Sequence, residues 1–232
     1  MSISRLRQFD VPSGLAQLSR SLTPESIRPI MTGANRLARE ALVRLWLTEG
    51  IPEGFGDCPA VYETMRHWLA GELATSPKNI TLVGSARTGF SMSPPPAFGR
   101  PFGDHSDLDL AIVCPELFEA VAKAFHLFAD DFASGTTVPR NDRQRAFWPE
   151  NVAFGNRNIP KGFVDPNKIP SLDRYAPVPR ILNTMWLLSE RLQLTPGAPA
   201  VKAASVRVYR DWQDLIARVS LSLWASLRPR SN

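Results

Sequence analysis

Cysteine and histidine are scarce in this chain of 232 residues, which contains two cysteines and three histidines. Cys58 and Cys114 lie far apart and do not have the spacing of a cysteine–histidine metal centre. Cys114 continues an apolar run, so we expect it to be a core thiol. His105 has no evident partner to orient it, so we interpret it as a loop residue rather than a catalytic base.

Long apolar runs are also missing. The most apolar late stretch, Leu215 to Leu227, contains Arg218 and is shorter than the roughly 20 residues that a membrane span requires. The chain does not open with the charged-then-apolar pattern of a signal peptide. Neither end is a long low-complexity tail, and internal repeats are not evident. We therefore expect a folded cytoplasmic protein with no membrane partner.

The composition allows one large domain, or one domain with a helical lobe, because 44% of the residues are hydrophobic. The formal net charge is +5 and the sequence pI is about 9.6. A basic balance suits polyphosphate ligands or nucleic acid, although it is also common in proteins that bind neither. Charge alone therefore changes the expected function only slightly.

The stretch from Ile80 to Val113 is the most informative part of the chain. Two runs, Ile80–Val83 and Ser106–Val113, predict buried strands, and Gly84-Ser85 ends the first of them. Side chains alternate across a strand, so the two carboxylates of the second run share one face. Two adjacent carboxylates repel each other, and a divalent cation relieves that cost. Mg²⁺ prefers a few carboxylates together with substrate phosphates.

The alternating side chains of the second strand place its apolar residues on the opposite face. We expect a layer of helices to cover these apolar residues, which are Leu108, Leu110 and Ile112. The Gly-Ser turn after the first strand offers backbone N–H groups and a hydroxyl to a phosphate. Together these parts predict a site for a metal–nucleoside triphosphate complex.

This order of strand, Gly-Ser and Asp-x-Asp resembles the DNA polymerase beta-like nucleotidyltransferase superfamily. Val83-Gly84-Ser85 and Asp107-Leu108-Asp109-Leu110 match its pattern. The spacer from Ala86 to Ser106 is longer than is usual there, and Ser91 to Asp104 would form a Pro-rich loop at the rim of the site. The resemblance covers about Pro77 to Pro170. It implies an α/β (α+β) fold with a small mixed sheet, flanking helices and a helical C-terminal lobe.

The resemblance also implies a third metal-site carboxylate on a later strand beside the Asp-x-Asp strand. Asp165 is the best match, because Lys161–Asp165 reads as a short strand that Pro166 ends. Its rivals are Asp130, Asp131 and Asp142, but the first two lie late in a predicted helix and the third in a loop. The implied catalytic and metal-binding residues are Asp107, Asp109 and Asp165, with two ions of Mg²⁺ (or Mn²⁺) per site. The implied nucleotide-binding residues are Gly84, Ser85, Arg87 and Ser106, although Arg87 can equally be a surface residue of a first helical turn.

The rest of the chain is predicted to be mainly helical. Helices are predicted for 14–22, Thr32–Thr48, the residues after Pro59, Pro115 to about Phe132, Val178–Leu194 and Val201–Leu227. The Pro-rich stretch from Pro170 to Pro179 is predicted to be a surface linker. These elements divide the chain into an N-terminal extension that packs on the core (1–76), a catalytic core (77–170) and a C-terminal helical lobe (171–232).

Two groups of basic residues have open interpretations. Residues 134–158 interleave arginines with Phe147, Trp148 and Phe154, a pattern that suits single-stranded nucleic acid but also an ordinary amphipathic helix and loop. The C-terminal basic residues either face the cleft and meet phosphates or form a solvated surface. These are Arg180, Arg191, Lys202, Arg207 and Arg210.

The implied reaction is nucleotidyl transfer from an NTP or dNTP to a hydroxyl acceptor. The arrangement looks most like the bacterial stand-alone enzymes that make nucleotide signals or short template-independent oligonucleotides in anti-phage defence. The implied partners are a nucleoside triphosphate, an oligonucleotide and an effector protein. Two alternatives stay open. One is a protein-AMPylating enzyme of a toxin–antitoxin pair, and the other is a catalytically inactive module that binds nucleic acid or a partner.

Overall fold

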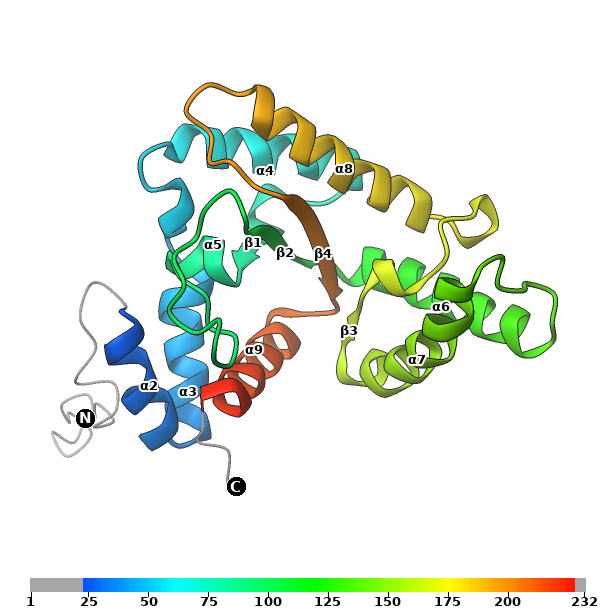
Figure 1. Ribbon diagram of the computed structural model, residues 1–232, viewed down its shortest axis with the longest axis horizontal. Helices are drawn as coiled ribbons and strands as arrows, with labels where there is room; N and C mark the ends of the chain where they lie inside the picture. The colour runs from blue at the N-terminus through cyan, green and yellow to red at the C-terminus, as the bar shows by residue number, and fades with distance from the viewer. Residues whose placement is uncertain (1–22, 228–232) are drawn as a thin grey trace, which may run out of the picture.

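The computed structural model describes residues 23–227, in which a four-stranded mixed sheet is flanked by helices (Figure 1). The strand order is β1-β2-β4-β3. β2 pairs antiparallel with β1 and parallel with β4, and β3 pairs antiparallel with β4. The strands are β1 (Ile80–Val83), β2 (Asp107–Val113), β3 (Phe163–Val164) and β4 (Ala203–Tyr209). This arrangement confirms the predicted mixed α+β class.

The helices begin at the capping signals that the sequence provides. Asn35 and Asn141 each accept a hydrogen bond from the backbone three residues on, and proline occupies the first turn of several other helices. The helices are α2 (Pro24–Gly33), α3 (Arg36–Val43), a π-helical turn (Arg44–Thr48), α4 (Pro59–Leu73), α5 (Ser85–Thr88), α6 (Pro115–Ala133), α7 (Asp142–Asn158), α8 (Val178–Leu194) and α9 (Trp212–Leu227). The predicted helix over 14–22 lies outside the described residues.

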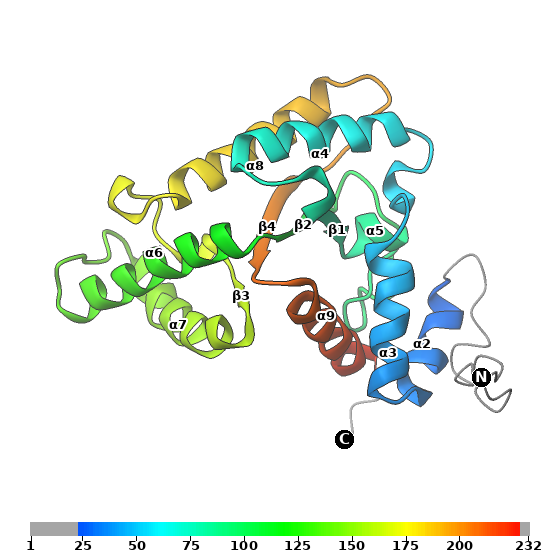
Figure 2. The ribbon, with the colours of Figure 1, turned by 180° about the vertical axis from the view of Figure 1, so that it is seen from behind.

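The main hydrophobic core lies on one face of the sheet. Leu108, Leu110 and Ile112 of β2 are at most 1% exposed and pack with α4, α6 and α8. Figure 1 and Figure 2 show α4 and α8 running side by side over this part of the molecule. The opposite face carries Asp107 and Asp109 at one end and a smaller apolar cluster at the other, where Leu215 of α9 packs. The predicted division of β2 into two faces is confirmed.

The predicted helix from Val201 to Leu227 is wrong in its first half, where residues 203–209 form β4. Val206 and Val208 are fully buried, whereas Arg207 between them is exposed, which is the two-residue period of a strand. Asp211 then caps α9, since its carboxylate accepts a hydrogen bond of 2.8 Å from the backbone N–H of Asp214. The C-terminal segment therefore supplies β4 between β2 and β3. The predicted domain boundary at residue 170 separates β4 from the other three strands of the same sheet.

The stretch predicted to be a surface linker also enters the core. Tyr175 is completely buried, and its hydroxyl donates a hydrogen bond of 2.9 Å to Oδ2 of Asp131. The hydroxyl groups of Tyr175 and Thr137 are 2.8 Å apart, and Arg174 pairs with the same carboxylate. The proline-rich composition gave no sign of this network, because its other members lie about forty residues earlier in the chain.

The N-terminal helices pack differently from one another. The sequence predicted that all of them pack on the core. α4 does so over the sheet, whereas α2 and α3 pack against α9 (Figure 2). A second hydrophobic cluster joins them and includes Phe90 and Met92 from the loop between β1 and β2. The first and last described helices thus hold the Pro-rich loop against the sheet edge.

Candidate functional site

Both carboxylates of the Asp-x-Asp motif line a cavity of about 490 Å³. The β1–β2 register pairs Val83 with Asp109, which brings the Gly84-Ser85 turn beside the end of β2. The remaining walls come from the Pro-rich loop, from β4 and from α9. Four of the predicted nucleotide or metal ligands, Gly84, Ser85, Asp107 and Asp109, are therefore together, and Ser106 joins them in the lining.

Gly84 permits the close approach of the two strands at this point. Its φ is +68° and its ψ is −152°, a conformation that residues with a side chain rarely adopt. A Cβ on Gly84 would lie 3.0 Å from Oδ2 of Asp109. The glycine thus leaves room for the carboxylate beside the turn, which explains why this position requires glycine.

Ser205 holds the other oxygen of the same carboxylate. Its hydroxyl donates a hydrogen bond of 2.7 Å to Oδ1 of Asp109, because the β2–β4 register places the two residues opposite each other. β4 is the strand beside the Asp-x-Asp strand, where the resemblance puts a third carboxylate. None of its residues, Ala203 to Tyr209, is acidic. Ser205 therefore occupies the position nearest to the one that the resemblance reserves for an aspartate.

The structure does not bring Asp165 into a shared ligand set with Asp107 and Asp109. β4 lies between β2 and β3, so two strand spacings of about 4.8 Å, roughly 10 Å in all, separate the backbones of β2 and β3. Oδ1 of Asp165 accepts a 3.0 Å hydrogen bond from the N–H of Asn167 and caps the next turn. Within residues 23–227, no cluster of three aspartate, glutamate, histidine or cysteine side chains is arranged to hold a metal ion.

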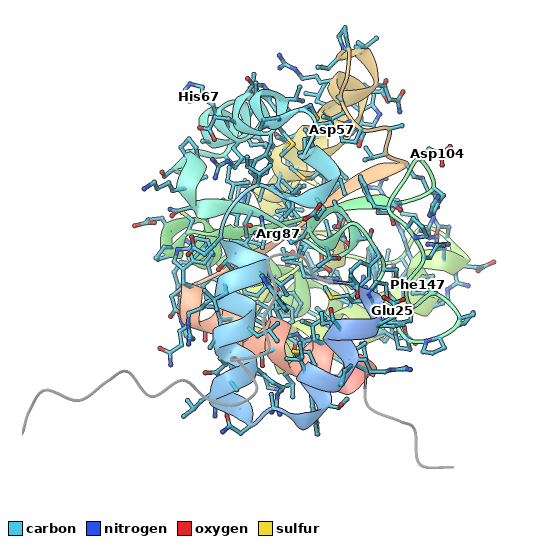
Figure 3. All side chains as sticks on the ribbon, turned by 90° about the vertical axis from the view of Figure 1, so that its left-hand side faces the viewer. Glu25, Asp57, His67, Arg87, Asp104 and Phe147 are labelled. Carbon is cyan, nitrogen blue, oxygen red and sulfur yellow. The ribbon has the colours of Figure 1, made fainter. Side chains whose placement is uncertain are left out.

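Arg87 also lies apart from the cavity. Its Nε and Nη1 donate hydrogen bonds of 2.8 Å and 2.9 Å to the backbone oxygens of Trp46 and Gly50. Figure 3 shows Arg87 within the body of the molecule, whereas Asp104 lies at its edge. Burial lowers the pKa of the Arg87 guanidinium. The side chain thus joins α5 to the π-helical turn, and the structure does not place it with the predicted phosphate ligands.

The Pro-rich loop lies at the rim of the cavity, as the sequence predicted. Backbone hydrogen bonds fix its shape, including those from Ser91 N–H to the Arg100 oxygen and from Phe102 N–H to the Gly89 oxygen, both 2.8 Å. His105 lines the cavity, and its Nδ1 is 3.5 Å from Oδ1 of Asp104. His105 therefore belongs to the cavity lining, and its contact with the exposed Asp104 is the only ion pair that it makes within residues 23–227.

Two arginines give the site a positive side, and only one of them, Arg207, is among the basic residues that the sequence offered as phosphate contacts. Arg207 of β4 and Arg218 of α9 both line the cavity, and Arg218 lies 4.6 Å from the centroid of the Phe163 ring. Burial lowers the pKa of Arg218, and the nearby Arg207 lowers it further. Burial also raises the pKa of Tyr209 in the same wall. Arg207 lies in β4 and not in the predicted helix, and the two-residue period of 203–209 is the sequence signal for that strand.

The donor set fits one magnesium ion better than two. Mg²⁺ commonly binds through one or two carboxylates and completes its coordination with water and substrate phosphates. Asp107 and Asp109 meet that requirement at the cavity wall. A second ion needs further anionic ligands, and among the described residues the structure adds none to this pair.

Scans of protein-family models, of curated proteins and of solved structures find no significant match to this chain. The geometry of the cavity therefore carries the functional argument. In residues 23–227, no helix combines the length and the apolar character that crossing a membrane requires.

Proposed function

We propose that this chain is a metal-dependent nucleotidyltransferase that moves a nucleoside monophosphate from a nucleoside triphosphate to a hydroxyl acceptor. The observation that carries this proposal is the pair Asp107 and Asp109 beside the Gly84-Ser85 turn, in the wall of one cavity. The volume of about 490 Å³ lies within the range of small-molecule sites. Carboxylates, a hydroxyl and arginines in one cavity suit a metal–polyphosphate ligand.

The protein side chains would act mainly by positioning. Asp107 and Asp109 would hold one Mg²⁺ ion, which supplies charge neutralisation at the triphosphate. Ser205 and the space beside Gly84 fix the carboxylate of Asp109 before the ligand arrives. Ser85 and Ser106 place hydroxyl groups in the same lining. Such preorganisation supports phosphoryl-group chemistry, where positioning and electrostatics supply most of the catalysis.

Resemblance alone supports the finer proposal that the product is a nucleotide signal or short oligonucleotide in bacterial anti-phage defence. One structural observation favours a second candidate, a catalytically inactive module that binds nucleotide or nucleic acid. That observation is the lack of an acidic residue in β4, beside Asp109. The two candidates share the same ligand site and differ in whether turnover occurs.

The test is incubation of the purified protein with each α-labelled NTP and dNTP and with Mg²⁺ or Mn²⁺. The proposed enzyme yields a new labelled species that disappears in Asp107→Asn/Asp109→Asn and persists in the control Asp142→Asn, whose carboxylate is 97% exposed. Label on the protein itself would indicate protein modification. Binding of nucleotide without any product, in the presence of candidate acceptors, would favour the inactive module instead.

A further inference from the structure

Arg207 and Arg218 converge on the cavity from different elements. The register of β4 places Arg207 two residues beyond Ser205, on the same face of the sheet as Asp109. Arg218 reaches the cavity from α9 and packs over Phe163, whose ring stacks on Tyr209 with centroids 5.7 Å apart. The aromatic pair thus holds one guanidinium in the cavity wall.

Neither guanidinium is neutralised within residues 23–227. Neither Arg207 nor Arg218 takes part in an ion pair or side-chain hydrogen bond to the rest of the described chain, although other arginines of the protein do. Arg210, for example, lies 2.8 Å from Oδ2 of Asp214, and Arg174 pairs with Asp131. Two like charges in one cavity wall repel each other, so an anion that contacts both would stabilise the pair.

We propose that Arg207 and Arg218 form a binding subsite for the terminal phosphates of the nucleoside triphosphate, and for the pyrophosphate that leaves. This inference rests on the proposed function of the cavity. Planar guanidinium groups bind phosphate oxygens in bidentate geometry and keep their charge at all physiological pH values. The two arginines supply fixed positive charge in the same cavity as the carboxylate pair, where the donor set suits one metal ion.

The subsite predicts metal-independent binding of a polyphosphate. The probe is inorganic tripolyphosphate, titrated calorimetrically into the full chain in the presence of EDTA. We expect the wild type to bind, Arg207→Gln and Arg218→Gln each to weaken binding by about tenfold or more, and Asp107→Asn/Asp109→Asn to bind at least as tightly. The matched control is Arg210→Gln, which removes an equal charge from an arginine that already has an acidic partner.

Two results would overturn the proposal. One is wild-type protein that does not bind tripolyphosphate without metal, and the other is binding by both arginine variants at the strength of the Arg210→Gln control. Arg207 is exposed, so Arg207→Gln decides the question alone if Arg218→Gln does not fold. The outcomes separate from those of the proposed function. If the protein binds tripolyphosphate but does not transfer nucleotides, the arginine subsite is supported and the proposed enzymatic function is rejected. If nucleotidyl transfer occurs at the same rate in both arginine variants, the enzymatic function is supported and the subsite is rejected.

Discussion

The hydroxyl of Ser205 donates a hydrogen bond of 2.7 Å to Oδ1 of Asp109, so a side chain of β4 orients a carboxylate of β2. This contact shows how the site is built from distant segments. It also shows that the strand next to the Asp-x-Asp strand offers a hydroxyl where a metal site of three carboxylates needs an acid. The number of metal ions that the site binds is therefore the property that substitutions at Ser205 can test most directly.

Replacement of Ser205 by aspartate would add a third carboxylate beside Asp109. We expect Ser205→Asp to raise the number of Mn²⁺ ions bound with nucleotide from one to two per chain, because the second ion gains an anionic ligand. Electron paramagnetic resonance of free Mn²⁺ measures this number. Ser205→Ala is the control and should bind one ion about fivefold more weakly, since one hydrogen bond of roughly 1 kcal/mol no longer orients the carboxylate. Two ions on the wild type would contradict the interpretation.

Replacement of Gly84 by alanine should damage both stability and binding. The residue has a positive φ, and the new Cβ would meet Oδ2 of Asp109 at 3.0 Å. We expect Gly84→Ala to lower the free energy of unfolding by about 1–3 kcal/mol and to weaken metal–nucleotide binding. Urea unfolding and calorimetry measure the two effects.

Gly71→Ala is the matched control, because Gly71 lies in α4 with open space around it and alanine should stabilise the helix by about 0.5–1 kcal/mol. Equal behaviour of the two variants would refute this account.

Arg87 should behave as a structural residue. The buried Arg87 would lose its two partly buried hydrogen bonds to the backbone oxygens of Trp46 and Gly50 in Arg87→Ala. We expect a loss of about 2–4 kcal/mol in the free energy of unfolding, with the nucleotide affinity of the folded protein unchanged. The control Arg180→Ala removes an exposed arginine and should change stability by less than about 0.5 kcal/mol. If Arg87→Ala instead lost nucleotide affinity while keeping the wild-type free energy of unfolding, Arg87 would be a phosphate-binding residue.

Tyr209 should make the protein sensitive to alkaline pH. Burial raises the pKa of its hydroxyl above the usual value of about 10, so the folded state favours the neutral phenol. The stability that this preference provides is fully present below about pH 10 and is lost as pH rises through the raised pKa. We expect Tyr209→Phe to lose less stability than the wild type between about pH 9 and 11, as measured by urea unfolding at each pH. Identical pH profiles would show that Tyr209 ionises equally in both states.

Local sequence patterns were sufficient for part of this molecule. The strand Ile80–Val83 and the helix Val178–Leu194 have the bounds that the sequence predicted, and the second strand begins at Asp107, one residue after the predicted start at Ser106. The alternation in β2 also predicted that Asp107 and Asp109 share a face opposite the buried leucines. These features depend on apolar period and on turn residues within a few positions, which a single sequence displays directly.

The neighbours of the carboxylate pair were decided by tertiary structure. Ser205 and Asp109 are 96 positions apart, and only strand pairing brings them together. The helix predicted for Val201–Leu227 left no room for β4, which lies between β2 and β3. Asp165, the predicted third ligand, follows β3 and so lies beyond β4, and Arg207 lies in a strand instead of a helix. The order of strands depends on which apolar faces pack together across the whole chain, and local periodicity does not contain that information.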